Sequence, residues 1–108
     1  MPHADLKYSA DMEFDARAML QGIEDVLNAL DPEAGKCKGR AYPAEVFLHR
    51  HLLVEVHMLA KPMRDAAFTA RAMAALEAEI KRHVSQACEF SLKILYAPST
   101  YITHAYTP

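Results

Sequence analysis

A chain of 108 residues with 52% hydrophobic residues has the size and core content of one domain, which excludes a disordered protein and predicts a single domain over residues 1–108. Its 12 basic and 14 acidic residues give a net charge of −2 without a run of either sign, which argues against a nucleic-acid partner. No apolar stretch reaches the roughly 20 residues of a membrane span, so we expect no membrane partner either.

The first half of the chain predicts a strand, a helix and a second strand. Residues 2–8 alternate between apolar and polar side chains, as in a strand with one buried face. Residues 9–11 offer helix N-caps, and apolar residues spaced by three and four predict a helix over 12–30. Pro32 ends that helix, because the residue before a proline disfavours helical geometry. An extended segment follows at roughly 40–48.

The second half repeats the same order. Residues 52–59 alternate again and predict a strand. Asp65 is a suitable N-cap for an alanine-rich helix over 66–86. Residues 89–96 predict the last strand, and we expect the polar tail over 99–108 to lie on a neighbouring subunit or to stay mobile.

This order of elements predicts an α+β fold of the form βαβ–βαβ. Right-handed crossovers place both helices on one face of a four-stranded sheet. The opposite face is then bare, although it includes apolar residues such as Leu53 and Leu59. Because covering that face requires a partner, we expect a symmetric homotrimer with the sheets facing inward and the helices outside.

Pro2 is the residue that carries most information about chemistry. If the initiator methionine is removed, the nitrogen of Pro2 becomes a secondary amine that can accept and release a proton. Burial or a nearby guanidinium lowers the pKa of such an amine toward neutrality, which suits a base that abstracts a proton next to a carbonyl. Taken alone, a proline after methionine is more often inert, so its neighbours decide the interpretation.

Four short segments, in order along almost the whole chain, form a pattern around this proline. They are residues 2–9 (PHADLKYS), 38–42 (KGRAY), 54–58 (VEVHM) and 61–64 (KPMR). In this order and spacing they resemble the 5-carboxymethyl-2-hydroxymuconate Δ-isomerase family of the tautomerase superfamily. The resemblance implies a trimeric, cofactor-independent keto–enol isomerase that acts on a carboxylate-bearing dienol or unsaturated 2-keto acid.

The resemblance also implies roles for individual residues. Pro2 matches the general base, and Arg64 matches an arginine that binds a substrate carboxylate. Arg40 matches a second catalytic cation, but Lys38 is an equal candidate and the resemblance does not choose between them. A planar guanidinium suits a carboxylate because it can donate two parallel hydrogen bonds. We expect no metal and no cofactor.

Two alternatives remain open from the sequence. Two histidines at 49 and 51 share a face if 49–51 is a strand, and with His57 they are a weak candidate for a zinc site. The same βαβ–βαβ order also builds non-catalytic modules that bind small molecules or drive oligomerisation. Retention of Met1 would favour such a module, because the nitrogen of Pro2 would then be an amide.

The two cysteines indicate the cellular compartment of the protein. Cys37 and Cys88 are too few for a disulfide framework or a zinc knuckle. The first residues of the chain also lack the basic and apolar regions of a secretory signal. We therefore expect a cytoplasmic protein with two unpaired thiols.

Overall fold

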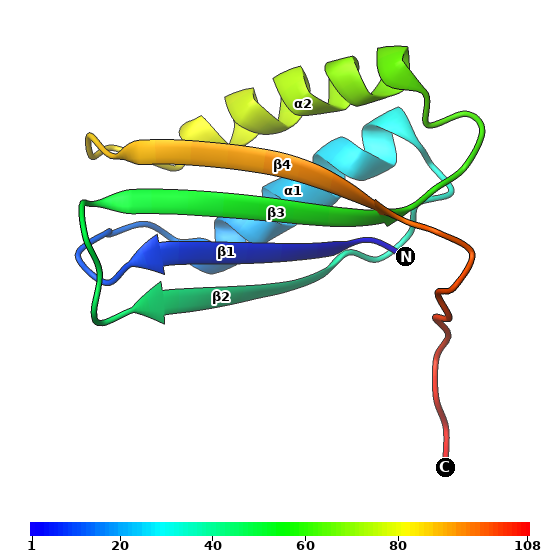
Figure 1. Cartoon of the computed structure of the whole chain (residues 1–108), viewed down its shortest axis with the longest axis horizontal. Helices are drawn as coiled ribbons and strands as arrows, with labels where there is room; N and C mark the ends of the chain where they lie inside the picture. The colour runs from blue at the N-terminus through cyan, green and yellow to red at the C-terminus, as the bar shows by residue number, and fades with distance from the viewer.

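The structure, a computed structural model, describes all residues from 1 to 108 and has the predicted βαβ–βαβ order (Figure 1). The elements are β1 (His3–Ser9), α1 (Ala16–Leu30), β2 (Lys38–Ala44), β3 (His51–Leu59), α2 (Ala66–Lys81) and β4 (Glu89–Ala97). Neither helix is long and apolar enough to cross a membrane.

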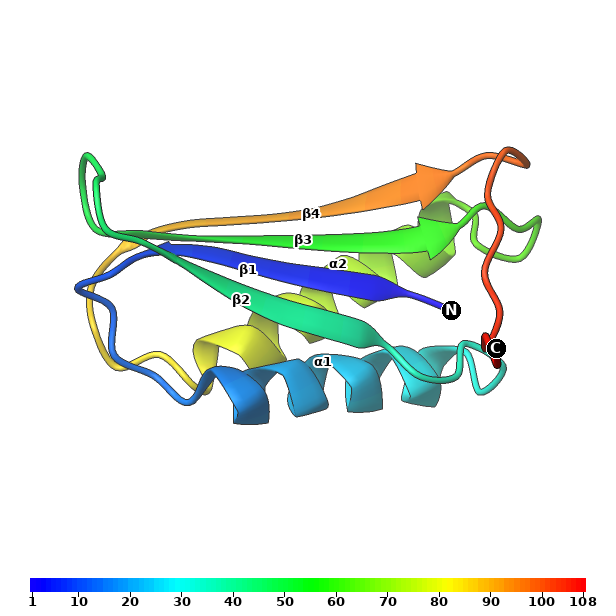
Figure 2. The ribbon, with the colours of Figure 1, turned by 90° about the horizontal axis from the view of Figure 1, so that it is seen from below.

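The four strands form one mixed sheet in the order β2-β1-β3-β4. Each helix connects a parallel pair, α1 joining β1 to β2 and α2 joining β3 to β4. The two halves meet where β1 and β3 run antiparallel at the centre of the sheet. Figure 2 shows both helices on the same side of the sheet, which confirms the predicted α+β architecture.

The core lies between the helices and one face of the sheet, and the alternation of β1 and β3 explains it. Alternate residues of these strands are buried, with Tyr8 partly buried, and the inward stripes of both helices cover them. The burial of a leucine, isoleucine or phenylalanine contributes about 1.5–3 kcal/mol to folding. The buried set comprises Ala4, Leu6, Met19, Ile23, Leu27, Leu52, Val54, Val56, Met58, Phe68, Ala72, Leu76 and Ile80.

Helix α1 begins later than the predicted residue 12. Asp15 is its N-cap, and its carboxylate accepts a hydrogen bond from the Ala18 N–H at 3.0 Å. The apolar residues Met12 and Phe14 before it pack against the core without being helical. Met12 is only 6% exposed, and the Phe14 ring packs edge-on against Tyr8 at 4.7 Å between centroids.

The predicted bounds of two other elements were also wrong. Strand β2 begins at Lys38 and ends at Ala44, because its parallel register against β1 begins at the pair His3–Lys38. The residues that follow are exposed in the β2–β3 loop, Val46 by 95%. Helix α2 ends at Lys81 instead of 86, whereas its predicted N-cap, Asp65, is confirmed by a 2.9 Å hydrogen bond from the Phe68 N–H.

The sheet face away from the helices carries a row of charges. The strand register aligns Arg40, Asp5, Glu55 and Lys93 across all four strands. Arg40 pairs with Asp5 at 2.6 Å, and Glu55 pairs with Lys93 at 3.3 Å and with Lys7 at 2.7 Å. This face is therefore more charged than the apolar residues Leu53 and Leu59 suggested.

Candidate active site

The N-terminal residues lie at one end of the sheet, where β1 and β2 begin and β3 ends. In the register, His3 stands between Lys38 of β2 and His57 of β3. Pro2 is buried, and its carbonyl oxygen accepts a hydrogen bond from the Lys38 N–H at 2.9 Å. The position of Pro2 is thus fixed by main-chain pairing and by packing.

Three cations act on the N-terminal amine through their charge. Burial lowers the pKa of the Met1 amine below its ordinary value, and the positive charges of Lys38, Lys61 and Arg64 lower it further. Each of these effects disfavours the protonated amine. The same surroundings would act on the nitrogen of Pro2 once Met1 has been removed.

Arg64 lies in a buried ion pair. One terminal nitrogen donates to Asp31 Oδ2 at 2.7 Å, and the other donates to the Leu59 carbonyl oxygen at 2.6 Å. The two charged side chains are only 3% and 2% exposed. Nε of Arg64 is also buried and has no hydrogen-bond partner. Both terminal nitrogens are therefore engaged within the chain and not directed at an open site.

Asp31 is the matching anion. Burial by itself raises the pKa of Asp31, but hydrogen bonds from Arg64 and from the Glu33 N–H outweigh it and hold that pKa below its ordinary value. Asp31 is therefore ionised near neutral pH and pairs with the Arg64 guanidinium.

The two candidates for the second cation differ in position. The Lys38 ammonium donates to Thr103 Oγ1 at 3.0 Å and belongs to the cations that act on the N-terminal amine. Arg40 lies farther along β2 on the charged face, where it contacts Asp5 and lies 3.2 Å and 3.3 Å from Nδ1 of His3. The structure thus brings Lys38, and not Arg40, together with Arg64 around the chain terminus.

Two further parts of the chain reach this site that the sequence analysis did not identify. Lys61 follows β3, and because β3 is antiparallel to β1, the turn after β3 lies at the end of the sheet where β1 begins. A sequence prediction that β1 and β3 pair antiparallel would have placed Lys61 at this end of the sheet. The tail after β4 crosses the same end of the sheet (Figures 1 and 2), where the Tyr101 hydroxyl donates to the Met1 carbonyl oxygen at 3.1 Å. No periodic pattern in the tail signals that contact.

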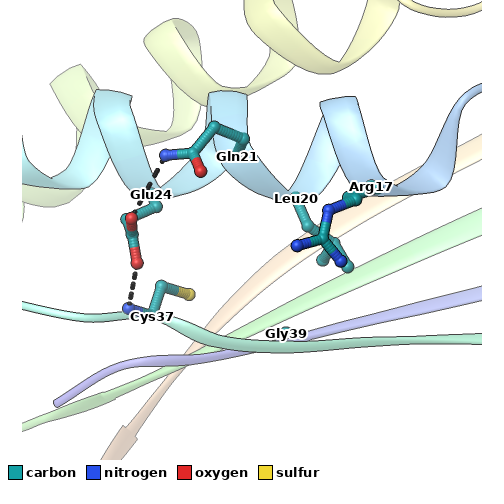
Figure 3. Close-up of a pocket in the computed structure, with 6 residues that line it drawn as sticks. All are labelled: Arg17, Leu20, Gln21, Glu24, Cys37 and Gly39. Atoms are coloured by element: carbon teal, nitrogen blue, oxygen red, sulfur yellow. Dashed lines mark hydrogen bonds between the residues drawn. The ribbon is translucent and has the colours of Figure 1, made fainter.

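A groove between α1 and β2 is a separate feature. It holds about 180 Å³ and is lined by Arg17, Leu20, Gln21, Glu24, Cys37 and Gly39. Figure 3 shows the Glu24 carboxylate between Gln21 and the Cys37 N–H, which donates to it at 2.7 Å. Burial raises the pKa of the Cys37 thiol to about 11, so the thiol is protonated and unreactive at neutral pH. None of the predicted site residues lines this groove.

The histidines do not form a metal site. His49 lies in the β2–β3 loop with φ of +62° and not on a strand, so the prediction that it shares a strand face with His51 was wrong. Nδ1 of His51 lies 2.9 Å from the His49 carbonyl oxygen. No group of three histidine, cysteine, aspartate or glutamate side chains is placed to hold a metal ion.

No protein-family model matches this chain, and no curated protein matches it in sequence. Solved structures match over nearly the whole length. A crystal structure of 5-carboxymethyl-2-hydroxymuconate delta-isomerase is 15% identical with a TM-score of 0.64, covering 100% of this chain and 89% of that one. FG41 malonate semialdehyde decarboxylase inhibited by 3-bromopropiolate is 11% identical with a TM-score of 0.69, and the match covers 97% of this chain and 90% of the decarboxylase chain. A fused wild-type 4-OT described as a symmetric trimer is 18% identical with a TM-score of 0.71, and the match covers 95% of this chain and 91% of the 4-OT chain.

These matches concern the fold, since identities below 20% do not carry residue roles. At that level they show that the chain has the same fold as the isomerase, the decarboxylase and 4-OT, which agrees with the fold that the resemblance implied.

Proposed function

We propose that this chain is a cofactor-independent keto–enol isomerase in which Pro2, freed by removal of Met1, is the general base. The observation that carries the proposal is the convergence of burial and three cations on the N-terminal amine. These effects favour the neutral form of an amine, and a base whose pKa lies near the working pH is efficient in proton transfer. The match in fold to an isomerase and a decarboxylase supports an enzyme of this general kind.

The proposed reaction converts a carboxylate-bearing dienol, similar to 5-carboxymethyl-2-hydroxymuconate, into its unsaturated ketone. The nitrogen of Pro2 takes the proton of the enol hydroxyl, and the electron pair left on the oxygen forms the ketone as the double bonds shift. The protonated Pro2 then returns the proton to the distal carbon. One base performs both transfers, so the reaction needs no metal and no second substrate.

We propose a different role for each of the cations. We propose that Lys38, whose ammonium lies at the end of the sheet, binds a substrate carboxylate. Arg64, held by Asp31, acts on Pro2 through its charge, which lowers the proton affinity of the amine. Arg40 is the less favoured second cation, because Asp5 and His3 already occupy its guanidinium.

We further propose that the active form is a cytoplasmic homotrimer. The solved 4-OT match is described as a symmetric trimer, and the sheet face away from the helices has no covering element in this chain. Both cysteines are unpaired, which is usual for a protein of a reducing compartment.

Three forms of the protein test the base. The processed protein, Pro2→Ala, and a form with one extra residue before Pro2 are first checked by mass spectrometry. They are then incubated with 2-hydroxymuconate while ultraviolet absorbance follows the loss of the dienol. Pro2→Ala should keep part of the activity, because a primary amine remains, and the extended form should lose it, because its Pro2 nitrogen is an amide.

The opposite pattern would support the non-catalytic alternative. If the chain retains Met1, or if the extended form is as active as the processed protein, Pro2 is not the base. A module that binds small carboxylates without converting them would then be the better interpretation.

A further inference from the structure

The C-terminal tail brings a phenol close to the nitrogen at which the proposed chemistry begins. The Tyr101 hydroxyl donates a hydrogen bond to the Met1 carbonyl oxygen at 3.1 Å. That carbonyl is bonded directly to the nitrogen of Pro2 through C=O and C–N bonds of about 1.2 and 1.3 Å. The hydroxyl therefore lies within about 6 Å of the proposed catalytic nitrogen.

A second contact holds this part of the tail in place. Thr103 Oγ1 accepts a hydrogen bond from the Lys38 ammonium at 3.0 Å. Tyr101 and Thr103 are half-buried, whereas Ile102 between them is 84% exposed. The segment therefore lies against the end of the sheet with alternate side chains turned inward, and one of its anchors is a cation of the proposed site.

The Met1 carbonyl marks where a substrate oxygen would lie. Removal of Met1 takes away the acceptor of the Tyr101 hydrogen bond and opens the space beside the nitrogen of Pro2. A dienol whose hydroxyl proton passes to that nitrogen must place its oxygen against it, in the same region. The phenol then faces the oxygen that gains negative charge as the proton leaves.

We propose that Tyr101 is a catalytic residue that donates a hydrogen bond to the enolate oxygen of the substrate, an inference that rests on the proposed function. Pro2 takes the hydroxyl proton, the oxygen carries the charge while the double bonds shift, and the proton returns to the distal carbon from Pro2. Tyr101 keeps its own proton throughout, so the step remains balanced. It gives the tail a role in turnover.

The test compares Tyr101→Phe with Tyr106→Phe, a matched change at a tail tyrosine that is 79% exposed. Both are made in the processed protein and assayed with 2-hydroxymuconate. Loss of one donor to a developing oxyanion lowers kcat by about 100-fold. We expect a loss of that size in kcat, with little change in KM, for Tyr101→Phe and none for Tyr106→Phe.

Two further variants separate chemistry from tail packing. Thr103→Val removes the second anchor and keeps the phenol, so it should raise KM more than it lowers kcat. Replacement of Tyr101 by 3-fluorotyrosine keeps the ring and changes the acidity of its hydroxyl, so it should change kcat without altering the binding of the tail. If 3-fluorotyrosine leaves kcat unchanged and Thr103→Val lowers kcat as much as Tyr101→Phe, Tyr101 is only a structural anchor.

The proposed function and this inference can fail separately. Full activity in the form extended before Pro2 would reject the proposal that Pro2 is the base, regardless of the result for Tyr101→Phe. Inactivity of the extended form, together with wild-type kcat in Tyr101→Phe, keeps Pro2 as the base and rejects the role of Tyr101.

Discussion

At the scale of single residues, the charge of Lys38 should change the pKa of the proposed base. Lys38 is the first of the three cations that lower the pKa of the N-terminal amine, after burial, and Arg40 is not among them. Because a lower pKa keeps the amine neutral at lower pH, kcat/KM should rise with pH along a limb set by that pKa. Lys38→Ala should move the limb to higher pH, and Arg40→Ala should leave it in place. Equal shifts in the two pH–rate profiles would contradict the assignment.

The ion pair of Arg64 and Asp31 predicts a stability effect of a different kind. Removal of one partner leaves a buried charge unpaired, so Arg64→Met or Asp31→Leu alone should cost about 3–5 kcal/mol in urea unfolding. The double variant should recover much of that loss, because neither charge is then buried. The exposed pair Lys81–Glu77 provides the control, since Glu77→Ala should change the free energy of unfolding by less than about 1 kcal/mol. Additive losses in the double variant would show that the two residues are not coupled.

The ion pair of Arg64 and Asp31 also makes the stability of the folded protein depend on pH. The pKa of Asp31 is lower in the folded chain than its ordinary value, so the pair contributes fully above pH about 4 and its contribution is lost as the pH falls through the folded pKa. The wild-type protein should therefore lose stability below pH 4 more steeply than the double variant does.

The sequence predicted some of these residues and not others. Pro2, Lys38 and Arg64 were predicted as site residues because the resemblance to the isomerase family implied roles for them. The sequence does not show that Asp31 engages Arg64, because that contact joins the ends of two loops 33 residues apart. Tyr101 lies in a tail without periodicity, so no pattern could assign it a partner.

At the scale of elements, the two helices depend on their aspartate caps. Asp15 and Asp65 each accept a hydrogen bond from the main-chain N–H three residues later. Asp15→Ala should destabilise the protein by about 1 kcal/mol, as measured by thermal or urea unfolding. Asp25→Ala, at an exposed position inside α1, is the matched control and should cost much less. Equal costs would mean that the loss of charge matters and not the loss of the cap.

The boundaries of the elements were less predictable than their order. Alternation identified β1, β3 and β4, because one face of each strand packs on the core. The start of α1 was missed because Met12 and Phe14 look like part of its apolar stripe, yet they pack against the core from a non-helical segment. The end of β2 was missed because the apolar residues Val46 and Leu48 extend the pattern but lie exposed in a loop.

At the scale of the whole molecule, the face with the charged row is expected to become an interface. Light scattering at micromolar concentration should give about three times the chain mass of 12.1 kDa. Glu55 is already 89% covered in the isolated chain, and it is held by two lysines. Its replacement by lysine would place three like charges together and should shift the mass toward that of the monomer. A monomeric mass for the wild-type protein would reject the trimer.

Both chain ends lie at the same end of the sheet, and this has a practical consequence for anyone who labels or purifies the protein. A purification tag before Pro2 would convert the proposed catalytic amine into an amide. A tag after residue 108 would extend the segment that carries Tyr101 and Thr103 and could disturb its contacts. The β2–β3 loop lies at the opposite end of the sheet (Figure 1), and its side chains at Val46 and Leu48 are 95% and 83% exposed. An epitope or fluorophore inserted there is the arrangement that leaves both termini native.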